Sequence, residues 1–172
     1  MKPHEALIAD VVKAAGNEVV GRIRLQKILY LLDQKGMGIK NADFRYYHYG
    51  PYSRALDEAL ERAKALNGVK EEIRFRKADG APFSVFKVQI DCSAPSKIGN
   101  MSLSQATHLI DTMKSKTSTV IELAATVHWL IKYEEVSDWK SEIVRRKGKK
   151  TEGGRLEEAL GLLQELELSI AS

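Results

Sequence analysis

The stretch GRIRLQKILYLLD at residues 21–33, followed by FRYYHYGPYS at residues 44–53, decides the fold. The first stretch is predicted to be an amphipathic helix, because its apolar residues recur at helical spacing. These residues are Leu25, Ile28, Leu29 and Leu32. The second stretch is predicted to open as an extended strand, because aromatic side chains favour strands. Gly50-Pro51 is expected to turn the chain sharply after that strand, since a proline restricts the residue before it.

The flanking residues extend this pattern into a larger N-terminal unit. Helices are predicted over residues 4–15 and 54–66, and Ser53 is a natural N-cap for the second of them. Residues 71–76 and 84–90 alternate apolar with polar or charged side chains, which predicts a β-hairpin. Three helices followed by a hairpin is the element order of a winged helix.

The remainder of the chain is predicted to be helical. A linker over 91–100 precedes helices over 102–114, over 117–132, from Ser137, and over 156–170, with a basic loop over 145–155. Ser102 and Gln105 make a capping box at the start of the first of these helices. The predicted fold class is mainly α (α+β), with a winged-helix-like N-terminal half that includes a β-hairpin and a helical C-terminal half. The chain is expected to be a single domain, 1–172, with sub-regions 1–91 and 101–172.

Composition and charge indicate which partners and which cellular compartment suit this sequence. The net charge is +4 and the pI is about 9.1, which suits nucleic acid or an acidic protein without requiring either. The single cysteine, Cys92, excludes an internal disulfide and fits a reducing cytoplasm. The N-terminus has no apolar run typical of a signal peptide. The least charged stretch, residues 117–131, is too short to span a bilayer, so no membrane association is expected.

No residue pattern predicts catalysis or a cofactor. The histidines His4, His48, His108 and His128 lack the i, i+4 spacing of a helical zinc site. No nucleophile elbow and no phosphate-binding glycine loop is present. The chain is therefore expected to have no metal, no cofactor and no enzymatic activity.

Three clusters of basic residues make nucleic acid a possible partner. They are Arg22, Arg24 and Lys27 near the start of the first stretch, a group on the predicted hairpin, and a group in the predicted loop that includes Lys147 and Lys150. Candidate contacts on the predicted hairpin are Arg74, Arg76 and Lys77, and candidates in the predicted loop are Arg145, Arg146 and Lys149. The third predicted helix argues against this, because a DNA-reading helix carries mostly basic and amide side chains. It presents Asp57, Glu58 and Glu61 among its basic residues. A winged-helix DNA-binding regulator is therefore the alternative function.

The aromatic strand leaves two interpretations open. Strand alternation places Tyr47 and Tyr49 on the face opposite Tyr46 and His48. In one interpretation the strand pairs with the predicted hairpin and both faces are covered. In the other, Tyr47, Tyr49 and Tyr52 form a partner-binding ridge, because tyrosine buries a large area yet keeps a polar tip. The leucine-rich last helix could in addition support a homodimer.

The same two stretches carry a family resemblance. GRIRLQKILYLLD resembles the opening helix of the Panacea or SocA-like proteins of bacteria and phages, and YYHYGPYS resembles their strand with its Tyr49-Gly50-Pro51 corner. The Tyr-Ser pair after the proline is closest to the YwgA-like branch. ATVHWLIKY at residues 125–133 is similar to a C-terminal helix of that branch.

The resemblance implies a helix-rich fold with a small sheet and neither catalysis nor a cofactor. It also implies an antitoxin-like, cytoplasmic protein that binds and neutralises a cognate toxin or, as in SocA, delivers a toxin to a protease. The resemblance does not indicate which residues bind a partner. The tyrosine ridge is therefore an inference from this sequence alone.

Overall fold

The computed structural model describes residues 3–89 and 94–168. Its α-helices are α1 (His4–Ala14), α2 (Arg22–Leu32), α3 (Arg54–Ala65), α4 (Leu103–Lys114), α5 (Ser118–Lys132), α6 (Trp139–Lys147) and α7 (Arg155–Glu165). Its strands are β1 (Glu18–Val20), β2 (Arg45–Tyr47), β3 (Gly50–Tyr52), β4 (Val69–Phe75), β5 (Pro82–Val88), β6 (Lys97–Ile98) and β7 (Met101–Ser102). The prediction of a mainly α (α+β) fold is confirmed.

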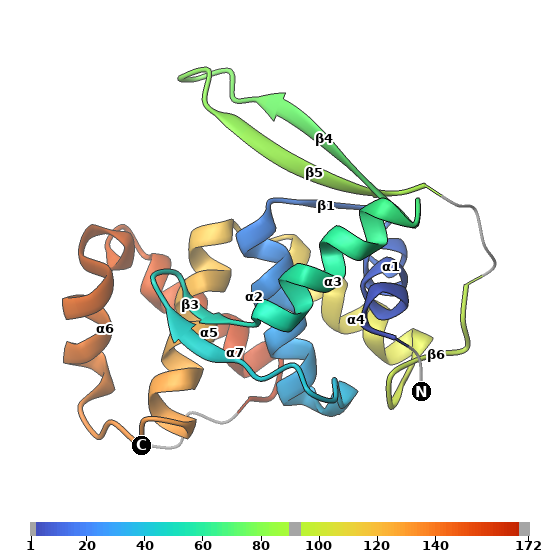
Figure 1. The fold of residues 1–172 in the computed structure, drawn as a ribbon. Coiled ribbons are helices and arrows are strands. Elements are labelled where there is room, and N and C mark those ends of the chain that lie inside the picture. Colours follow the sequence, from blue (N-terminus) through green and yellow to red (C-terminus); the bar gives the residue numbers. More distant parts are fainter. Residues whose placement is uncertain (1–2, 90–93, 169–172) are drawn as a thin grey trace.

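Three antiparallel strands form the largest sheet, in the order β1-β5-β4. The predicted hairpin is β4–β5, and its outer part projects away from the helices (Figure 1). At its base, Val19 of β1 pairs with Phe86 of β5, whose side chain is fully buried. β1 was missed in the sequence because three residues are too few to show an alternating pattern.

Helix α5 is the centre of the helical packing. Ten of its fifteen residues are buried, and it contacts α2, α6, α7 and β3. Thr117 caps its start by accepting a hydrogen bond from the backbone N–H of Val120 at 3.2 Å. The prediction of a buried helix over 117–132 is confirmed. Among the described helices, none is long and apolar enough to cross a membrane.

Local side-chain caps explain where two other helices begin. Ser53 accepts from the backbone N–H of Leu56 at 3.1 Å at the start of α3. Ser102 accepts from the backbone N–H of Gln105 at 3.2 Å at the start of α4. Both caps were predicted, because serine satisfies backbone donors that a helix N-terminus leaves free.

Several boundaries differ from the sequence prediction. Helix α2 continues into a π-helical turn, η1 (Asp33–Met37), where Gly36 has a φ of 100°. The expected linker contains the short strand β6, which pairs with β7 directly after it. The turn between the two strands docks on η1 through a hydrogen bond from the Asn100 N–H to the Met37 carbonyl. Arg145 and Arg146 lie in α6 rather than in a loop, and a 3-10 turn, η2 (Gly148–Thr151), follows them.

Helix α7 is shorter than predicted, and its leucines face inward. Leu162, Leu163 and the following Leu166 are buried, and α7 packs on α5. Leu156 and Leu160 are partly buried against the same core. The leucines proposed for dimerisation thus contribute to packing within one chain, and the homodimer stays a prediction.

Candidate functional site

The aromatic segment forms its own hairpin, β2–β3. Arg45 pairs with Tyr52, Tyr46 with Pro51, and Tyr47 with Gly50. The chain therefore reverses at residues 48–49, and the prediction of a turn at Gly50-Pro51 is wrong. The interpretation in which this strand pairs with β4–β5 is also wrong, because β2 pairs with β3 in a separate sheet.

Gly50 lets this hairpin approach α5 closely. Its φ is 93°, and a Cβ atom there would lie 2.5 Å from the hydroxyl oxygen of Thr126. Only glycine combines such a backbone conformation with so close an approach. The sequence corner at Gly50-Pro51 is thus a packing contact with α5.

The tyrosines predicted to form a ridge lie together on the outer side of this hairpin. Tyr47 and Tyr49 have 47% and 49% of their surface exposed. Tyr52 is partly buried, and its ring contacts that of Tyr47 edge to face at a centroid distance of 5.2 Å. Burial and a hydrogen bond with Asp57 raise the pKa of Tyr52 to about 12, so it stays protonated at neutral pH.

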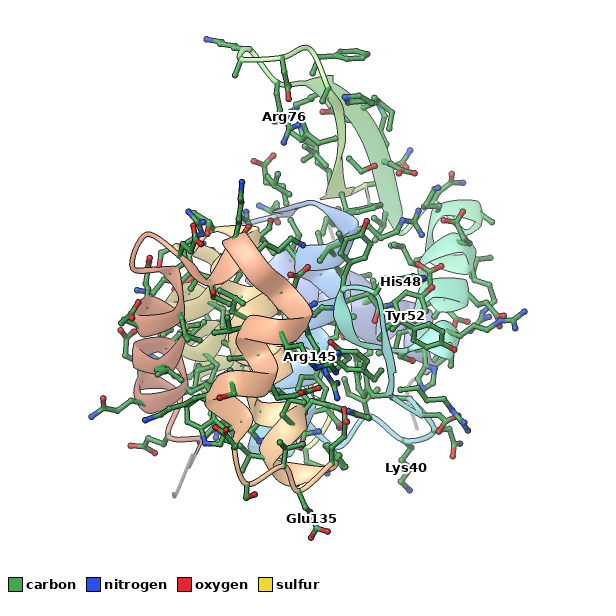
Figure 2. The ribbon with its side chains drawn as sticks, turned by 90° about the vertical axis from the view of Figure 1, so that its left-hand side faces the viewer. Lys40, His48, Tyr52, Arg76, Glu135 and Arg145 are labelled. Carbon is green, nitrogen blue, oxygen red and sulfur yellow. The ribbon has the colours of Figure 1, made fainter. Side chains whose placement is uncertain are left out.

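These rings border a pocket of about 210 Å³ between β2–β3 and the first half of α2. The residues that line it are Arg22, Ile23, Gln26, Lys27, Tyr47, Tyr49, Gly50 and Tyr52. Figure 2 shows the His48–Tyr52 region on the surface of the body, apart from Arg76 on the projecting hairpin. We call Tyr47, Tyr49, Tyr52 and this pocket the tyrosine surface.

Buried polar groups of α2 hold the hairpin beneath the tyrosine surface. Lys27 is 1% exposed, and its Nζ donates to the Pro51 carbonyl at 2.7 Å. Gln26 binds Ser53 twice, because its Nε2 donates to the Ser53 carbonyl and its Oε1 accepts from the Ser53 N–H, each at 2.9 Å. The hairpin is therefore fixed by contacts that solvent does not reach.

A second set of charges, of which Lys147 and Glu122 are buried, supports the turn of the hairpin. Lys147 of α6 donates to the His48 carbonyl at 3.2 Å and lies 3.5 Å from the Glu122 carboxylate. Lys150 of η2 reaches the same carboxylate at 3.0 Å. Glu122 thus pairs with two cations, and its negative charge also acts on Lys27.

This environment changes the acidity of the lysines. Burial lowers the pKa of Lys27 to about 8, although the Glu122 carboxylate opposes the change. Burial also lowers the pKa of Lys147, against the same carboxylate. Both lysines are buried cations that depend on Glu122 for compensation.

Two cations lie over aromatic rings of the hairpin. The Arg146 guanidinium is 4.7 Å from the Tyr46 ring centroid, and Lys150 Nζ is 5.1 Å from that of Tyr49. Such contacts are attractive because the face of the ring is electron-rich. They bring α6 and η2 into the support of the tyrosine surface.

The basic residues predicted for nucleic acid do not form one patch. Arg74, Arg76 and Lys77 lie on the projecting hairpin, whereas Arg145, Arg146 and Lys149 lie on α6 and η2, as the positions of Arg76 and Arg145 in Figure 2 illustrate. Most of their charges are balanced locally. Arg74 pairs with Glu72 at 3.1 Å and Arg76 with Asp79 at 2.7 Å. On α6, Arg145 pairs with Glu142 at 2.5 Å and Arg146 with Glu134 at 2.7 Å.

Among the residues that the structure describes, no group of three or more His, Cys, Asp or Glu side chains could hold a metal ion. His128 instead hydrogen-bonds through Nδ1 with the Tyr30 hydroxyl at 2.8 Å inside the core. Cys92 lies outside the described residues.

Sequence reasoning missed the polar support of the tyrosine surface. Gln26 and Glu122 were given no role, and Lys27, Lys147 and Lys150 were interpreted only as members of basic clusters. The one available signal was Lys27 itself, which stands between apolar residues of a helix that is buried all round from Leu25 to Leu32.

Comparison with known proteins gives two relatives. A DNA ADP-ribosyl glycohydrolase from Thermus aquaticus is 28% identical over 127 residues, which are 72% of this chain and 34% of that protein. The uncharacterized protein YwgA from Bacillus subtilis is 25% identical over 173 residues, which are 96% of this chain and 97% of that protein. No family model matches the chain.

These similarities differ in extent. The chain spans about a third of the length of the Thermus aquaticus protein but nearly all of YwgA. The resemblance to YwgA that the sequence suggested is therefore confirmed. The wider Panacea and SocA-like placement stays a prediction.

Proposed function

We propose that this protein is a non-enzymatic protein-binding module with an antitoxin-like role, which neutralises or delivers a cognate toxin through the tyrosine surface. One observation carries the proposal: three tyrosines surround a pocket of about 210 Å³ on a hairpin that buried side chains hold in place. The proposal places the protein in the bacterial or phage cytoplasm and within the Panacea and SocA-like group.

The physical argument is preorganisation. Tyrosines with exposed rings and polar tips are frequent at the centres of protein interfaces. Binding is stronger when such groups need not be ordered on contact. Lys27 and Lys147 fix the carbonyls of Pro51 and His48, so the backbone between the tyrosines is already ordered in the free protein.

The Thermus aquaticus relative is, by its name, an enzyme that acts on ADP-ribosyl groups of DNA. We propose that the part it shares with this chain contributes binding rather than hydrolysis. Glycoside cleavage usually needs two available carboxyl groups. Two carboxylates close to the tyrosine surface are in ion pairs, Asp57 with Arg22 at 2.7 Å and Glu122 with Lys150 at 3.0 Å.

The test is a tagged pulldown from the native host after nuclease treatment, with a variant that carries both Tyr47→Ala and Tyr49→Ala. We expect one small protein, toxic when expressed alone, to be retained by the wild type and reduced about tenfold or more by the variant. The variant should melt within about 2 °C of the wild type, because both rings are about half exposed.

The matched control is Phe75→Ala, which removes an exposed ring from β4–β5 and should retain the partner. A double tyrosine variant that binds as well as the wild type would contradict the proposal. Release of ADP-ribose from modified DNA by the purified chain would contradict its non-enzymatic part.

The second candidate is a DNA-binding regulator of the winged-helix type. The feature in its favour is the projecting β4–β5 hairpin after three helices, where Lys77 has no carboxylate partner within the described residues. The same pulldown distinguishes the two candidates. Retained nucleic acid that nuclease removes, with no protein left behind, would favour the regulator.

A further inference from the structure

A second pocket lies on a different face of α2 from the tyrosine surface and shares no residue with it. Its volume is about 440 Å³, and it opens between the end of α1, strand β1, helix α2 and the end of α4. Its lining residues are Ala15, Gly16, Glu18, Val19, Val20, Arg24, Ile28, Lys114 and Ser115.

Arg24 is the unusual residue of this pocket. Its Nε is buried and has no hydrogen-bond partner, and no carboxylate in the described part of the chain pairs with its guanidinium. Burial alone lowers the pKa of Arg24. Two residues earlier, Arg22 binds Asp57 at 2.7 Å and Glu61 at 2.9 Å. Among the described residues, Arg24 therefore has no carboxylate to balance its charge, whereas Arg22 has two.

A partly buried guanidinium without an acceptor is unfavourable. Buried donors in native proteins nearly always have a partner, and a charged donor left without one costs more than a neutral donor. Arg24 therefore brings to this pocket a positive charge that no described carboxylate compensates.

The other charges of the pocket indicate the sign of that acceptor. Lys114 Nζ donates to the Ala15 carbonyl at 3.2 Å and would lie 3.4 Å from a Cβ at Gly16, so its amine is on the pocket wall. Lys114 also pairs with Asp111 at 3.1 Å. The acidic residue of the lining, Glu18, lies 3.7 Å from Arg74 on the neighbouring sheet. The guanidinium of Arg24 is thus the uncompensated charge, and it is positive.

We propose that this pocket binds the phosphate group of a small phosphorylated molecule, with Arg24 as its main ligand and Lys114 as a second cation. Guanidinium groups bind phosphate through paired hydrogen bonds. A volume of about 440 Å³ exceeds the needs of a bare phosphate and is in the range of small-molecule sites. Val20 and Ile28 give the organic part of the ligand an apolar wall.

The proposal is tested by calorimetry and thermal melting with inorganic phosphate and phenyl phosphate, with acetate for comparison. We expect saturable binding of both phosphates, tighter for phenyl phosphate, and a rise in melting temperature of the wild type. Arg24→Gln should weaken binding about tenfold or more, and Lys114→Gln should weaken it less. Arg54→Gln, which removes an exposed arginine paired with Glu58, should bind as the wild type does.

Thermal melting of Arg24→Gln without phosphate shows whether the substitution itself destabilises the fold. It therefore separates a loss of binding from a loss of folding. Arg24→Gln should then be as stable as the wild type or more stable, because it removes an uncompensated charge. Absence of saturable binding up to about 10 mM phosphate, or equal binding by Arg24→Gln and Arg54→Gln, would overturn the proposal. Loss of duplex DNA binding in Arg24→Gln without any small-phosphate binding would also overturn it.

Discussion

The two exposed hairpins differ in what lies beneath their aromatic side chains. Beneath β2–β3, the buried lysines Lys27 and Lys147 bind backbone carbonyls. Glu122 forms an ion pair with Lys147, and its charge also favours the charged form of Lys27. The outer part of β4–β5 projects from the helices, and its Ile73 and Phe75 are 55% and 67% exposed (Figure 1). Both hairpins expose aromatic rings to solvent, but only in β2–β3 do buried lysines hold the backbone that carries those rings.

The largest effect expected at β2–β3 comes from removing the charge that supports this hairpin. Glu122→Gln leaves the buried Lys147 without its carboxylate and weakens the compensation of Lys27. We expect the free energy of unfolding to fall by about 3 kcal/mol, since breaking a buried ion pair leaves an uncompensated charge. Urea denaturation measures the loss.

Hydrogen exchange would show where Glu122→Gln acts. Amides of residues 45–52 should lose protection, while those of the base of β4–β5 should change little. Glu157→Gln, at an exposed position of α7, is the matched control and should leave both hairpins unchanged. Equal loss of protection in the two hairpins would remove the distinction between them.

The next effect is acid sensitivity near the start of β2. The ring of Tyr30, which hydrogen-bonds His128, contacts Phe44 at a centroid distance of 5.3 Å. Burial, with a smaller contribution from Lys132, lowers the pKa of His128 to about 4. The unfolded chain then binds more protons than the folded chain between pH 4 and about 6.5, so stability falls as the pH falls through this window.

Between pH 7 and pH 4.5 this one group should account for about 2–3 kcal/mol of lost stability. His128→Gln keeps a hydrogen-bonding group beside Tyr30 but does not titrate, so its urea midpoints should depend less on pH. Parallel pH profiles for the two proteins would show that His128 is not responsible.

The smallest effect is expected at the projecting hairpin. Phe75→Ser should change the free energy of unfolding by less than about 0.5 kcal/mol, because the ring is largely exposed. Phe86→Ser, in the buried part of the same hairpin, should cost about 3–5 kcal/mol. A loss above about 2 kcal/mol for Phe75→Ser would mean that its ring is covered in solution, and the contrast between the hairpins would then fail.

The features that were predictable from sequence are those encoded within a few residues. The capping serines Ser53 and Ser102 and the alternation of β4–β5 are local signals, and the structure confirms them. The three-residue strands β1, β2 and β3 carry too few residues for a pattern, so the turn at residues 48–49 was misplaced.

The polar base of the tyrosine surface was unpredictable for a different reason. A lysine in a helix usually faces solvent. Lys27 is buried because β3 and α5 cover the face of α2 on which it lies. Lys147 binds a carbonyl that is 99 positions away in the sequence. No local pattern contains such a pair, because it exists only after the distant segments pack.

The length of that link has a consequence for biosynthesis. When residues 45–52 leave the ribosome, α5 and α6 have not yet been made, so neither Thr126 nor Lys147 is present to hold the hairpin. Contacts between distant segments form late in folding, because the intervening chain must first be ordered. The tyrosines are therefore translated early but become an ordered surface late. A nascent chain that stalls before α6 would display the rings without the geometry that we propose a partner recognises.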